Sequence, residues 1–414
     1  IFLAFLVAVL VGLTIIIGPP GFAMFANSLY ETTTSTSLAT IPLFVLMGEV
    51  LFRSGSMEVM FDSADKLVGR IRGRQYVLVN VISALFGALA GAAMAVAAMM
   101  GRSLMPSMTA RGYDQRLSAG TILAGATLAP IIPPSLLAVI IGMLADVSIG
   151  DLLMAGTLPG LLFVVLFQAY ISVMLIVNPK LAPPIDREDA VRITWIERLM
   201  ACVRMSPFVV LLFVLMWIIL VGIATPSESA AASVIGAMII AAMHRRLDRK
   251  MLVESVFETV NVTVVILAIM MCSKMFTQLL SFTGSTTAAV RLATSLDLGH
   301  YGMLAMLMLI PFVMCMFIDS IAAMLVMIPI YKPIIAAFGY DPLWFWTLFL
   351  INISLGGMTP PFGYTMFAFK AVMPNMSMRQ IYSSCWPFVW IYLLGMLVLV
   401  LFPPIATWLP RVFK

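Results

Sequence analysis

The stretch "LAPIIPPSL", residues 128–136, decides how this chain folds, because it places three prolines inside an apolar segment long enough to cross a membrane. Pro130, Pro133 and Pro134 fall within five positions. Proline lacks the backbone donor of a helix and its ring clashes with the preceding turn, so no regular helix runs through residues 118–145. This segment is therefore predicted to be a proline-broken membrane helix.

The same pattern occurs a second time, in "GGMTPPFGY" at residues 356–364. "GYD" occurs at 112–114 and 339–341, and each copy is followed by a Pro-Pro pair, at 133–134 and 360–361. Both motifs recur at an offset of 227 residues (112 to 339, 133 to 360). Around them the order also repeats: a span, a short arm, a hairpin, a broken span and a closing span. We therefore predict an internal repeat.

Composition places the chain in a membrane. Of its 414 residues, 62% are hydrophobic and only 10% are charged, which is typical of an all-α polytopic membrane protein. Residues 1–17 carry no basic region, so they are predicted to be a span rather than a signal peptide, and the start at Ile suggests a trimmed N-terminus. The four cysteines and two histidines form no CxxC or HExxH pattern. We predict no cofactor, no transition metal and no nucleic-acid partner.

Apolar stretches predict the membrane spans at 1–17, 40–53, 118–145, 152–178, 206–223, 226–244, 257–281, 343–368 and 384–405. Two further segments, 75–110 and 300–338, are too long for one span and too interrupted for two. They are predicted to be re-entrant hairpins. Trp344, Trp346, Trp386 and Trp390 are expected to form an interfacial belt.

Basic residues set the predicted orientation. They cluster within 53–74, 180–204 and 245–250, whereas the connections 18–39, 146–151, 224–229 and 339–342 contain no Lys or Arg. The hairpin 75–110 is then expected to open to the cytoplasm and the hairpin 300–338 to the outside. The arms at 57–71 and 284–298 lie inside and outside respectively. An inverted repeat with broken helices is the architecture of secondary transporters, whose site lies near the midplane.

These boundaries divide the chain into five predicted parts. They are N-terminal spans and the start of the first repeat (1–56), the first repeat (57–178), a cytoplasmic loop with linking scaffold spans (179–256), the second, inverted repeat (257–405) and a C-terminal tail (406–414).

A helix break at membrane depth leaves backbone groups without partners unless they line a polar cavity or bind a ligand. Freed carbonyls can hold a cation, and helix N-termini can face an anion. The alternative for each break is a proline kink whose backbone groups are satisfied by neighbouring helices.

With these residues in view, the chain resembles the large membrane subunit (M subunit, DctM-like) of tripartite ATP-independent periplasmic (TRAP) transporters. The matching stretches are "GPPGFAMF" (18–25), "IPLFVLMGEVLFRSG" (41–55), "APIIPPS" (129–135), "TPSESAA" (225–231), "FIDSIAAMLVMIPI" (317–330) and "NISLGGMTPPFG" (352–363). The resemblance covers essentially the whole chain.

The resemblance implies an elevator-type ion transporter fold in the bacterial inner membrane, with sodium ions coupled to uptake of a small organic acid, a carboxylate or a sulfonate. It also implies two protein partners, a small membrane subunit (the Q subunit) and a periplasmic substrate-binding protein, with membrane lipid around them. The first hairpin, "GAAMAVAAMMGRSLMPSM" (91–108), departs from the family pattern. Such families usually show a small hydroxyl residue where Ala92 stands, often Asp where Val96 stands, and a small residue where Arg102 stands.

Asp319 is the strongest candidate cation ligand, because a carboxylate inside a membrane needs a partner or a cation. Sodium, like other hard cations, prefers oxygen ligands. The expected shell adds Ser320, Asn352, Thr359 and the carbonyls of Gly356 and Gly357. The alternative is that Asp319 only caps a helix N-terminus.

In the first repeat the predicted cation ligands are Thr127 and the carbonyls of Gly91, Ala129 and Pro130. The alternative for Thr127 is a hydrogen bond back to its own helix. Candidate substrate contacts are Arg102, Pro134, Ser135 and Pro361. Arg102 has a second interpretation, in which it extends towards the cytoplasmic surface.

Three further charged residues have structural interpretations. Glu228 is predicted to close a capping box with Thr225, and Glu49 to pair with Arg53 four residues on. Lys274 is expected to be paired or to extend towards the outer surface.

Two other functions were weighed against the binding-protein-dependent symporter. One is an organic-anion/cation symporter that works without a binding protein. The other is a membrane-embedded enzyme, which needs a catalytic set at one depth, and the two histidines, His244 and His300, lie in different regions of the chain.

Overall fold

The computed structural model describes residues 2–68, 71–90, 93–184 and 194–413, and the described residues form helices without strands. Within these described ranges, seven helices are long and apolar enough to cross a membrane. The N-terminal helices are α1 (Phe2–Gly12), η1 (Leu13–Ile17), α2 (Pro20–Thr34), η2 (Thr36–Ala39), α3 (Thr40–Arg53) and α4 (Ser56–Val68).

The first repeat continues with α5 (Arg74–Ala90), α6 (Ala93–Ala110), α7 (Gln115–Ala126), α8 (Leu136–Ala145), α9 (Ile149–Val177) and η3 (Pro179–Leu181). The linking helices are α10 (Trp195–Leu220), α11 (Pro226–Met243) and α12 (Arg249–Phe282). The second repeat contains α13 (Ser285–Ser295), α14 (Gly299–Cys315), α15 (Ser320–Ala337), α16 (Pro342–Gly356), α17 (Tyr364–Val372) and α18 (Met378–Leu401), and α19 (Pro404–Val412) follows.

Both predicted helix breaks are present. Residues 127–135 separate α7 from α8, and residues 357–363 separate α16 from α17. Each break contains a cis Pro-Pro bond, Pro133–Pro134 and Pro360–Pro361. The prediction of two proline-broken helices is therefore confirmed.

The two repeats match helix by helix. Each predicted hairpin segment is a pair of helices, α5 with α6 and α14 with α15. Both ends of α6 recur in α15 at the offset of 227 residues (93 to 320, 110 to 337), and α5 recurs in α14 at an offset of 225 (74 to 299, 90 to 315). The tip of the first hairpin, including Gly91 and Ala92, lies outside the described residues. The arm predicted at 57–71 contains α4, and the arm predicted at 284–298 contains α13.

The repeated "GYD" motif performs the same structural task in both copies. Its glycine, Gly112 or Gly339, adopts a positive φ (80° and 68°), which ends the second hairpin helix in a turn that favours glycine. The aspartate then caps the broken helix: the Asp114 carboxylate accepts from the Leu117 N–H (2.8 Å), and Asp341 accepts from the Trp344 N–H (3.1 Å).

The tyrosines of the two motifs hold the hairpins closed at their bases. The Tyr113 ring contacts Tyr76 in the first turn of α5, with centroids 5.1 Å apart. The Tyr340 ring lies 4.3 Å from His300 in the first turn of α14. The motif repeats in sequence because each copy joins the end of one hairpin to the start of the next helix.

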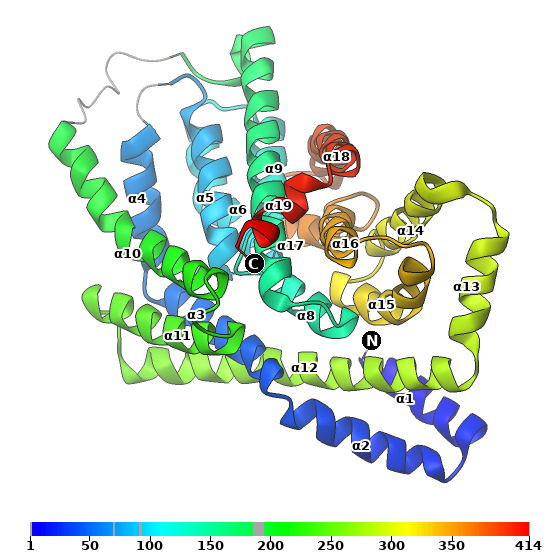
Figure 1. Cartoon of the computed structure of the whole chain (residues 1–414). Coiled ribbons are helices and arrows are strands. Elements are labelled where there is room, and N and C mark those ends of the chain that lie inside the picture. Colours follow the sequence, from blue (N-terminus) through cyan, green and yellow to red (C-terminus); the bar gives the residue numbers. More distant parts are fainter. Residues whose placement is uncertain (1, 69–70, 91–92, 185–193, 414) are drawn as a thin grey trace.

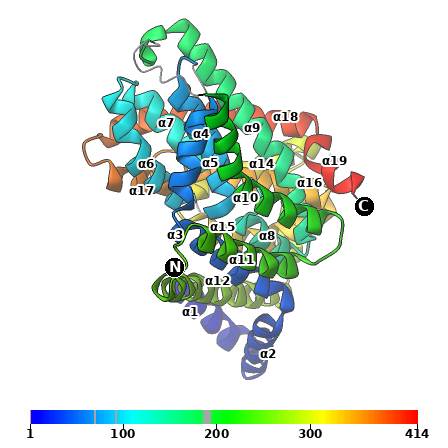
Figure 2. The same cartoon turned by 90° about the vertical axis from the view of Figure 1, so that its left-hand side faces the viewer.

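The helices form two groups. Helices α3, α10, α11 and α12 pack together, with α1 and α2 along α12, and Figure 1 shows this group as one side of the molecule. In the turned view, α1, α2 and α12 lie at the edge opposite α7 and α18 (Figure 2). The hairpins and broken helices pack across the repeats in the second group: α17 contacts α6, and α8 contacts α15.

Some predicted boundaries were wrong. The connection 18–39 contains helix α2, because Pro20 starts a helix that α12 covers on one face. Helix α12 extends well beyond the predicted span 257–281, and most of the predicted tail 406–414 lies in helix α19, which contacts α9. Trp344 and Trp346 are buried rather than interfacial; the Trp344 indole N–H donates to the Leu399 carbonyl at 2.9 Å.

Helix α7 packs closely on α18 at Gly120, and we expect Gly120→Ala to destabilise the protein. A Cβ there would lie 2.4 Å from the Ser384 carbonyl oxygen, a backbone atom that cannot rotate away. Overpacking of this kind costs about 1–3 kcal/mol, which offsets the higher helix propensity of alanine. Thermal unfolding in detergent measures the change. Gly236→Ala is the matched control, because its Cβ meets only the flexible end of Leu211; an equal loss in both variants would contradict the prediction.

Candidate cation and substrate site

The second hairpin meets the second helix break at the carboxylate of Asp319. Asp319 directly precedes α15, and its carboxylate accepts from the Ile321 N–H at 3.0 Å. The predicted capping role is therefore present in the structure. The side chain is only half-buried, and no ion pair among the described residues involves it. Capping uses one oxygen, so the carboxylate can hold a cation as well.

Ser320, the residue after Asp319, places a hydroxyl group between the hairpin tip and the broken helix. The Ser320 hydroxyl donates to the Ile353 carbonyl (3.2 Å) and lies 2.9 Å from the Tyr364 hydroxyl. The Tyr364 ring covers Gly357, where a Cβ would lie only 2.5 Å from the ring. Ser320 and Tyr364 therefore connect the hairpin tip to both halves of the broken helix.

We call the contact between a hairpin tip and the helix break of the same repeat a joint. The remaining predicted ligands at the second joint have protein partners. The Asn352 amide donates to the Met308 carbonyl of α14 at 2.6 Å. The Thr359 hydroxyl donates to the Leu355 carbonyl at 2.7 Å, and the Gly357 carbonyl accepts from the Thr365 hydroxyl at 2.8 Å. Asn352 thus fastens the broken helix to the hairpin. The Gly357 carbonyl also accepts from the Thr365 N–H at 3.2 Å, so both of its lone pairs are engaged within the protein.

The close approach of hairpin and break depends on one glycine in each repeat. A Cβ on Gly356 would lie 2.5 Å from Cys315 Cβ and 3.1 Å from the Phe312 carbonyl oxygen. In the first repeat, a Cβ on Gly87 would lie 2.6 Å from Ala129 Cα. These are equivalent positions (87 to 312, 129 to 356), with the glycine in the hairpin in one repeat and at the end of α16, directly before the break, in the other.

The first break is closed by its own side chains. The Thr127 hydroxyl donates back to the Ala124 carbonyl (2.7 Å), as the alternative interpretation predicted, and lies 2.8 Å from the Tyr392 hydroxyl of α18. Ser135 caps α8 by accepting from the Ala138 N–H (3.1 Å), and its hydroxyl donates to the Pro130 carbonyl. The predicted ligands Thr127, Ala129 and Pro130 are buried, and the Thr127 hydroxyl and the Pro130 carbonyl have partners within the protein.

The two breaks differ in access. Pro134 and Ser135 are buried, whereas Pro361 and Phe362 of the second break are exposed. Phe362 contacts Phe317 at the hairpin tip, with ring centroids 5.6 Å apart. In this structure the second joint is therefore the more accessible of the two.

Sequence reasoning missed two residues of these joints, Tyr364 and Tyr392. Tyr364 ends the quoted stretch "GGMTPPFGY", so its position after the break was a usable signal. Tyr392 lies in the middle of the apolar helix α18, 265 residues from Thr127, and no local pattern marks it.

The comparisons with known proteins agree with this architecture. The model of the family described as tripartite ATP-independent periplasmic transporter, DctM component, matches residues 1–405. The chain belongs to this family. It is thus a transport protein rather than an enzyme, and a multi-pass protein of the bacterial inner membrane.

Relatives of this DctM-family chain carry different substrate names. The ectoine TRAP transporter large permease protein TeaC of Halomonas elongata is 29% identical over 90% of this chain and 86% of its own. The C4-dicarboxylate TRAP transporter large permease protein DctM of Pseudomonas aeruginosa is 27% identical over 96% of this chain and 92% of its own. The family implies a small membrane subunit and a periplasmic binding protein as partners.

A solved structure shares the fold. The crystal structure of the YdaH transporter of Alcanivorax borkumensis matches with a TM-score of 0.67 at 15% identity, covering 94% of this chain and 89% of that one. At this identity the likeness concerns the fold alone.

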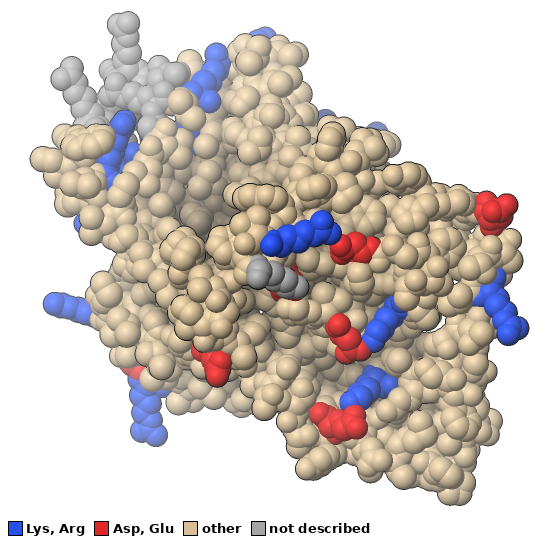
Figure 3. Space-filling model, viewed as in Figure 1, with Lys and Arg blue, Asp and Glu red and all other residues tan. Residues whose placement is uncertain are grey.

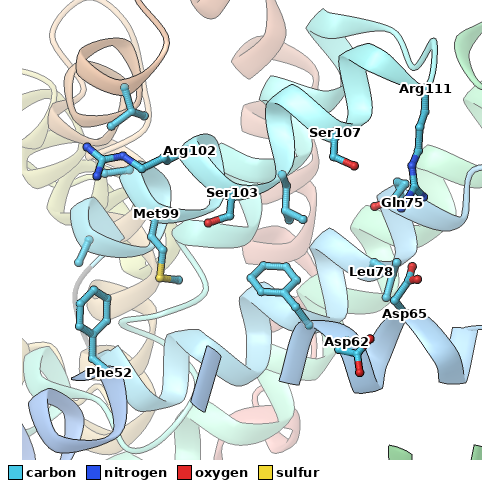
Figure 4. Close-up of a pocket in the computed structure, with 15 residues that line it drawn as sticks. Phe52, Asp62, Asp65, Gln75, Leu78, Met99, Arg102, Ser103, Ser107 and Arg111 are labelled. Carbon is cyan, nitrogen blue, oxygen red and sulfur yellow. The ribbon is translucent and has the colours of Figure 1, made fainter. Parts of the chain in front are cut away.

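Two cavities open on this DctM-family subunit. One, of about 1320 Å³, is lined by residues of three connections predicted to be external, 18–39, 146–151 and 224–229. The other, of about 840 Å³, is lined by arm α4 and hairpin helix α6 and includes Arg102 (Figure 4). Three of the four connections grouped by their lack of basic residues thus come together in space.

The other charged residues singled out from the sequence make capping bonds or ion pairs. The Thr225–Glu228 capping box is confirmed, with the Glu228 carboxylate accepting from the Thr225 N–H at 2.8 Å. Glu49 pairs with Arg53 at 3.2 Å, as predicted, and Lys274 pairs with Glu31 of α2. Figure 3 shows a face with few charges, where blue and red groups adjoin each other near the centre and others stand alone towards the edges.

Proposed function

We propose that this DctM-family subunit carries a small organic acid, a carboxylate or a sulfonate, into the cell together with sodium ions. A periplasmic substrate-binding protein delivers the acid, and a Q subunit packs beside the chain. The family membership supports the two partners. Relatives named for ectoine, C4-dicarboxylates and sialic acid support a small polar substrate but select none of them.

The observation that carries the sodium proposal is the carboxylate of Asp319 at the second joint. An ionised carboxylate at membrane depth is costly unless a cation or a basic side chain neutralises it. The described ion pairs provide no basic partner, and the Ser320 and Tyr364 hydroxyls add oxygen ligands nearby. Hard oxygen ligands suit sodium.

Transport in this proposal is an elevator movement. The hairpins are re-entrant, the two repeats have opposite topology, and the hairpins and broken helices move together against the group formed by α3, α10, α11 and α12. Sodium favours the state in which the hairpin tip lies on the break, since a ligand shifts an equilibrium only by binding one state more tightly. The cross-repeat contacts of α6 with α17 and of α8 with α15 support a single moving block.

Thermal stability of the purified complex with its small subunit tests the sodium site without a substrate. Sodium at ten times its Kd is expected to stabilise the folded state by about 1.4 kcal/mol relative to potassium or choline at equal ionic strength. Asp319→Ala should lose this stabilisation. An unchanged unfolding midpoint in wild type would exclude the sodium site under those conditions.

Coupling to protons is the second candidate, and it uses the same carboxylate. It predicts substrate uptake that depends on pH and is indifferent to sodium. Uptake into proteoliposomes under a sodium gradient or a pH gradient distinguishes sodium coupling from proton coupling. The same assay with the binding protein added or omitted tests whether delivery by the binding protein is required.

A further inference from the structure

The 840 Å³ cavity lies away from the two joints, between arm α4, the end of α3 and the hairpin helices α5 and α6. Figure 4 shows Arg102 and Met99 near one end of this cavity, Arg111 near the other, and Asp62 and Asp65 rising from α4. Its volume lies within the range of small-molecule pockets, ≈ 300–1,000 Å³.

The cavity is amphipathic. Its apolar lining consists of Phe52, Phe61, Leu78, Met99, Leu104 and Val372. Its polar lining includes Arg102, Ser103 and Ser107 on α6 and Arg111 directly after it. All four polar side chains can donate hydrogen bonds, so this wall suits an anion next to a hydrocarbon surface.

The acids of the cavity are already neutralised. Asp62 pairs with Lys66 at 2.6 Å and with Arg204 at 3.7 Å, and Asp65 pairs with Arg74 at 2.7 Å. By contrast, none of the ion pairs among the described residues involves Arg102 or Arg111. The cavity therefore keeps an uncompensated positive charge.

In the proposed topology, Arg102 lies well inside the cytoplasmic end of α6, with its side chain exposed to the cavity. Eight residues separate it from Ala110 at the end of α6, which corresponds to about 12 Å along the helix axis. A guanidinium at that depth needs an anion or a water-filled path.

We propose that this cavity binds an anionic amphiphile, with its acid group on Arg102 and Ser103 and its hydrocarbon body on Phe52, Phe61 and Met99. A guanidinium binds a carboxylate, sulfonate or phosphate through two parallel hydrogen bonds. The ligand comes from the transported acid after its passage or from an anionic lipid of the inner leaflet. The inference rests on the proposed topology, in which the cavity faces inward, but not on sodium coupling.

Binding of octanoate tests the site. The probe is titrated onto the complex in nanodiscs of phosphatidylcholine, in choline buffer without sodium, and followed by thermal stability. Wild type should be stabilised by octanoate and not by succinate, which lacks a hydrocarbon body. Arg102→Gln should weaken the apparent Kd at least tenfold, and Phe52→Ala should weaken it several-fold.

Matched variants make the assignment falsifiable. Arg291→Gln, on the exposed face of the second arm α13, should leave the octanoate Kd unchanged, as should Asp319→Asn. Equal binding by Arg102→Gln and wild type would overturn the proposal. Equal loss in Arg291→Gln, or succinate binding as tight as octanoate binding, would overturn it too. Because sodium is absent, these results are independent of the sodium site.

Nanodiscs that contain phosphatidylglycerol distinguish the two sources of the ligand. If the lipid headgroup occupies the cavity, the apparent Kd for octanoate should rise in wild type and not in Arg102→Gln. If the free acid is the ligand, the Kd should not depend on the lipid. Both results presuppose octanoate binding that requires Arg102, so a lipid effect equal in both proteins would contradict the proposal.

Discussion

Replacing Asp319 with Asn is expected to abolish sodium-dependent uptake while leaving the protein folded. Asparagine caps a helix as well as aspartate does, so the bond to the Ile321 N–H is retained and only the charge is lost. Removing one partner of a desolvated charge interaction costs about 3 kcal/mol or more, which weakens sodium binding roughly 150-fold. Sodium titration of thermal stability and uptake into proteoliposomes measure both effects.

Asp114→Asn provides the control for Asp319→Asn. Asp114 caps α7 in the same way, through a 2.8 Å bond from the Leu117 N–H, but lies at the base of the first hairpin rather than at a tip. Its replacement should change neither sodium affinity nor uptake. If Asp319→Asn keeps the wild-type sodium response, Asp319 is only a cap and the cation lies elsewhere.

Gly356→Ala is expected to cause the second large loss. The added Cβ would push α14 away from the break, because Cys315 Cβ and the Phe312 carbonyl leave no room for it. If the sodium-bound state requires this contact, an overpacking cost of about 1–3 kcal/mol raises the sodium Kd roughly 5- to 150-fold. Gly87→Ala should impair uptake to a similar extent, since Gly87 meets the backbone of Ala129.

A control substitution at a glycine far from both joints shows whether the loss of uptake is specific to the joints. Gly236→Ala in α11 places its Cβ against the mobile end of Leu211, far from either break, and should leave uptake unchanged. If Gly356→Ala and Gly236→Ala give the same sodium titration, the close approach of hairpin and break is not needed for sodium binding.

Local chemistry made much of the fold predictable. The paired prolines at 133–134 and 360–361 predicted both breaks, whereas single prolines such as Pro159 and Pro387 lie inside helices that continue past them. The "GYD" copies marked the bases of both hairpins, because a glycine with positive φ and an aspartate cap act within a few residues. The Thr225–Glu228 and Glu49–Arg53 pairs were predictable for the same reason, since their partners lie three or four residues apart.

The lengths of the helices were harder to predict from the sequence. Helix α2 and the extra turns of α12 include polar residues that a hydropathy argument assigns to a connection, but tertiary packing between these helices keeps them helical. Trp344 and Trp346 were assigned to an interface by residue type, whereas the fold buries them in the core.

The sequence by itself determined that this is an all-helical membrane protein with two matched broken helices and a carboxylate at the second hairpin tip. Only the tertiary structure decided which groups surround that carboxylate and which joint is open. The Ser320–Tyr364 and Thr127–Tyr392 contacts join residues 44 and 265 positions apart. The physical reason is the distance along the chain over which each interaction acts. Caps and turns join residues a few positions apart, whereas contacts between helices depend on how all the helices pack.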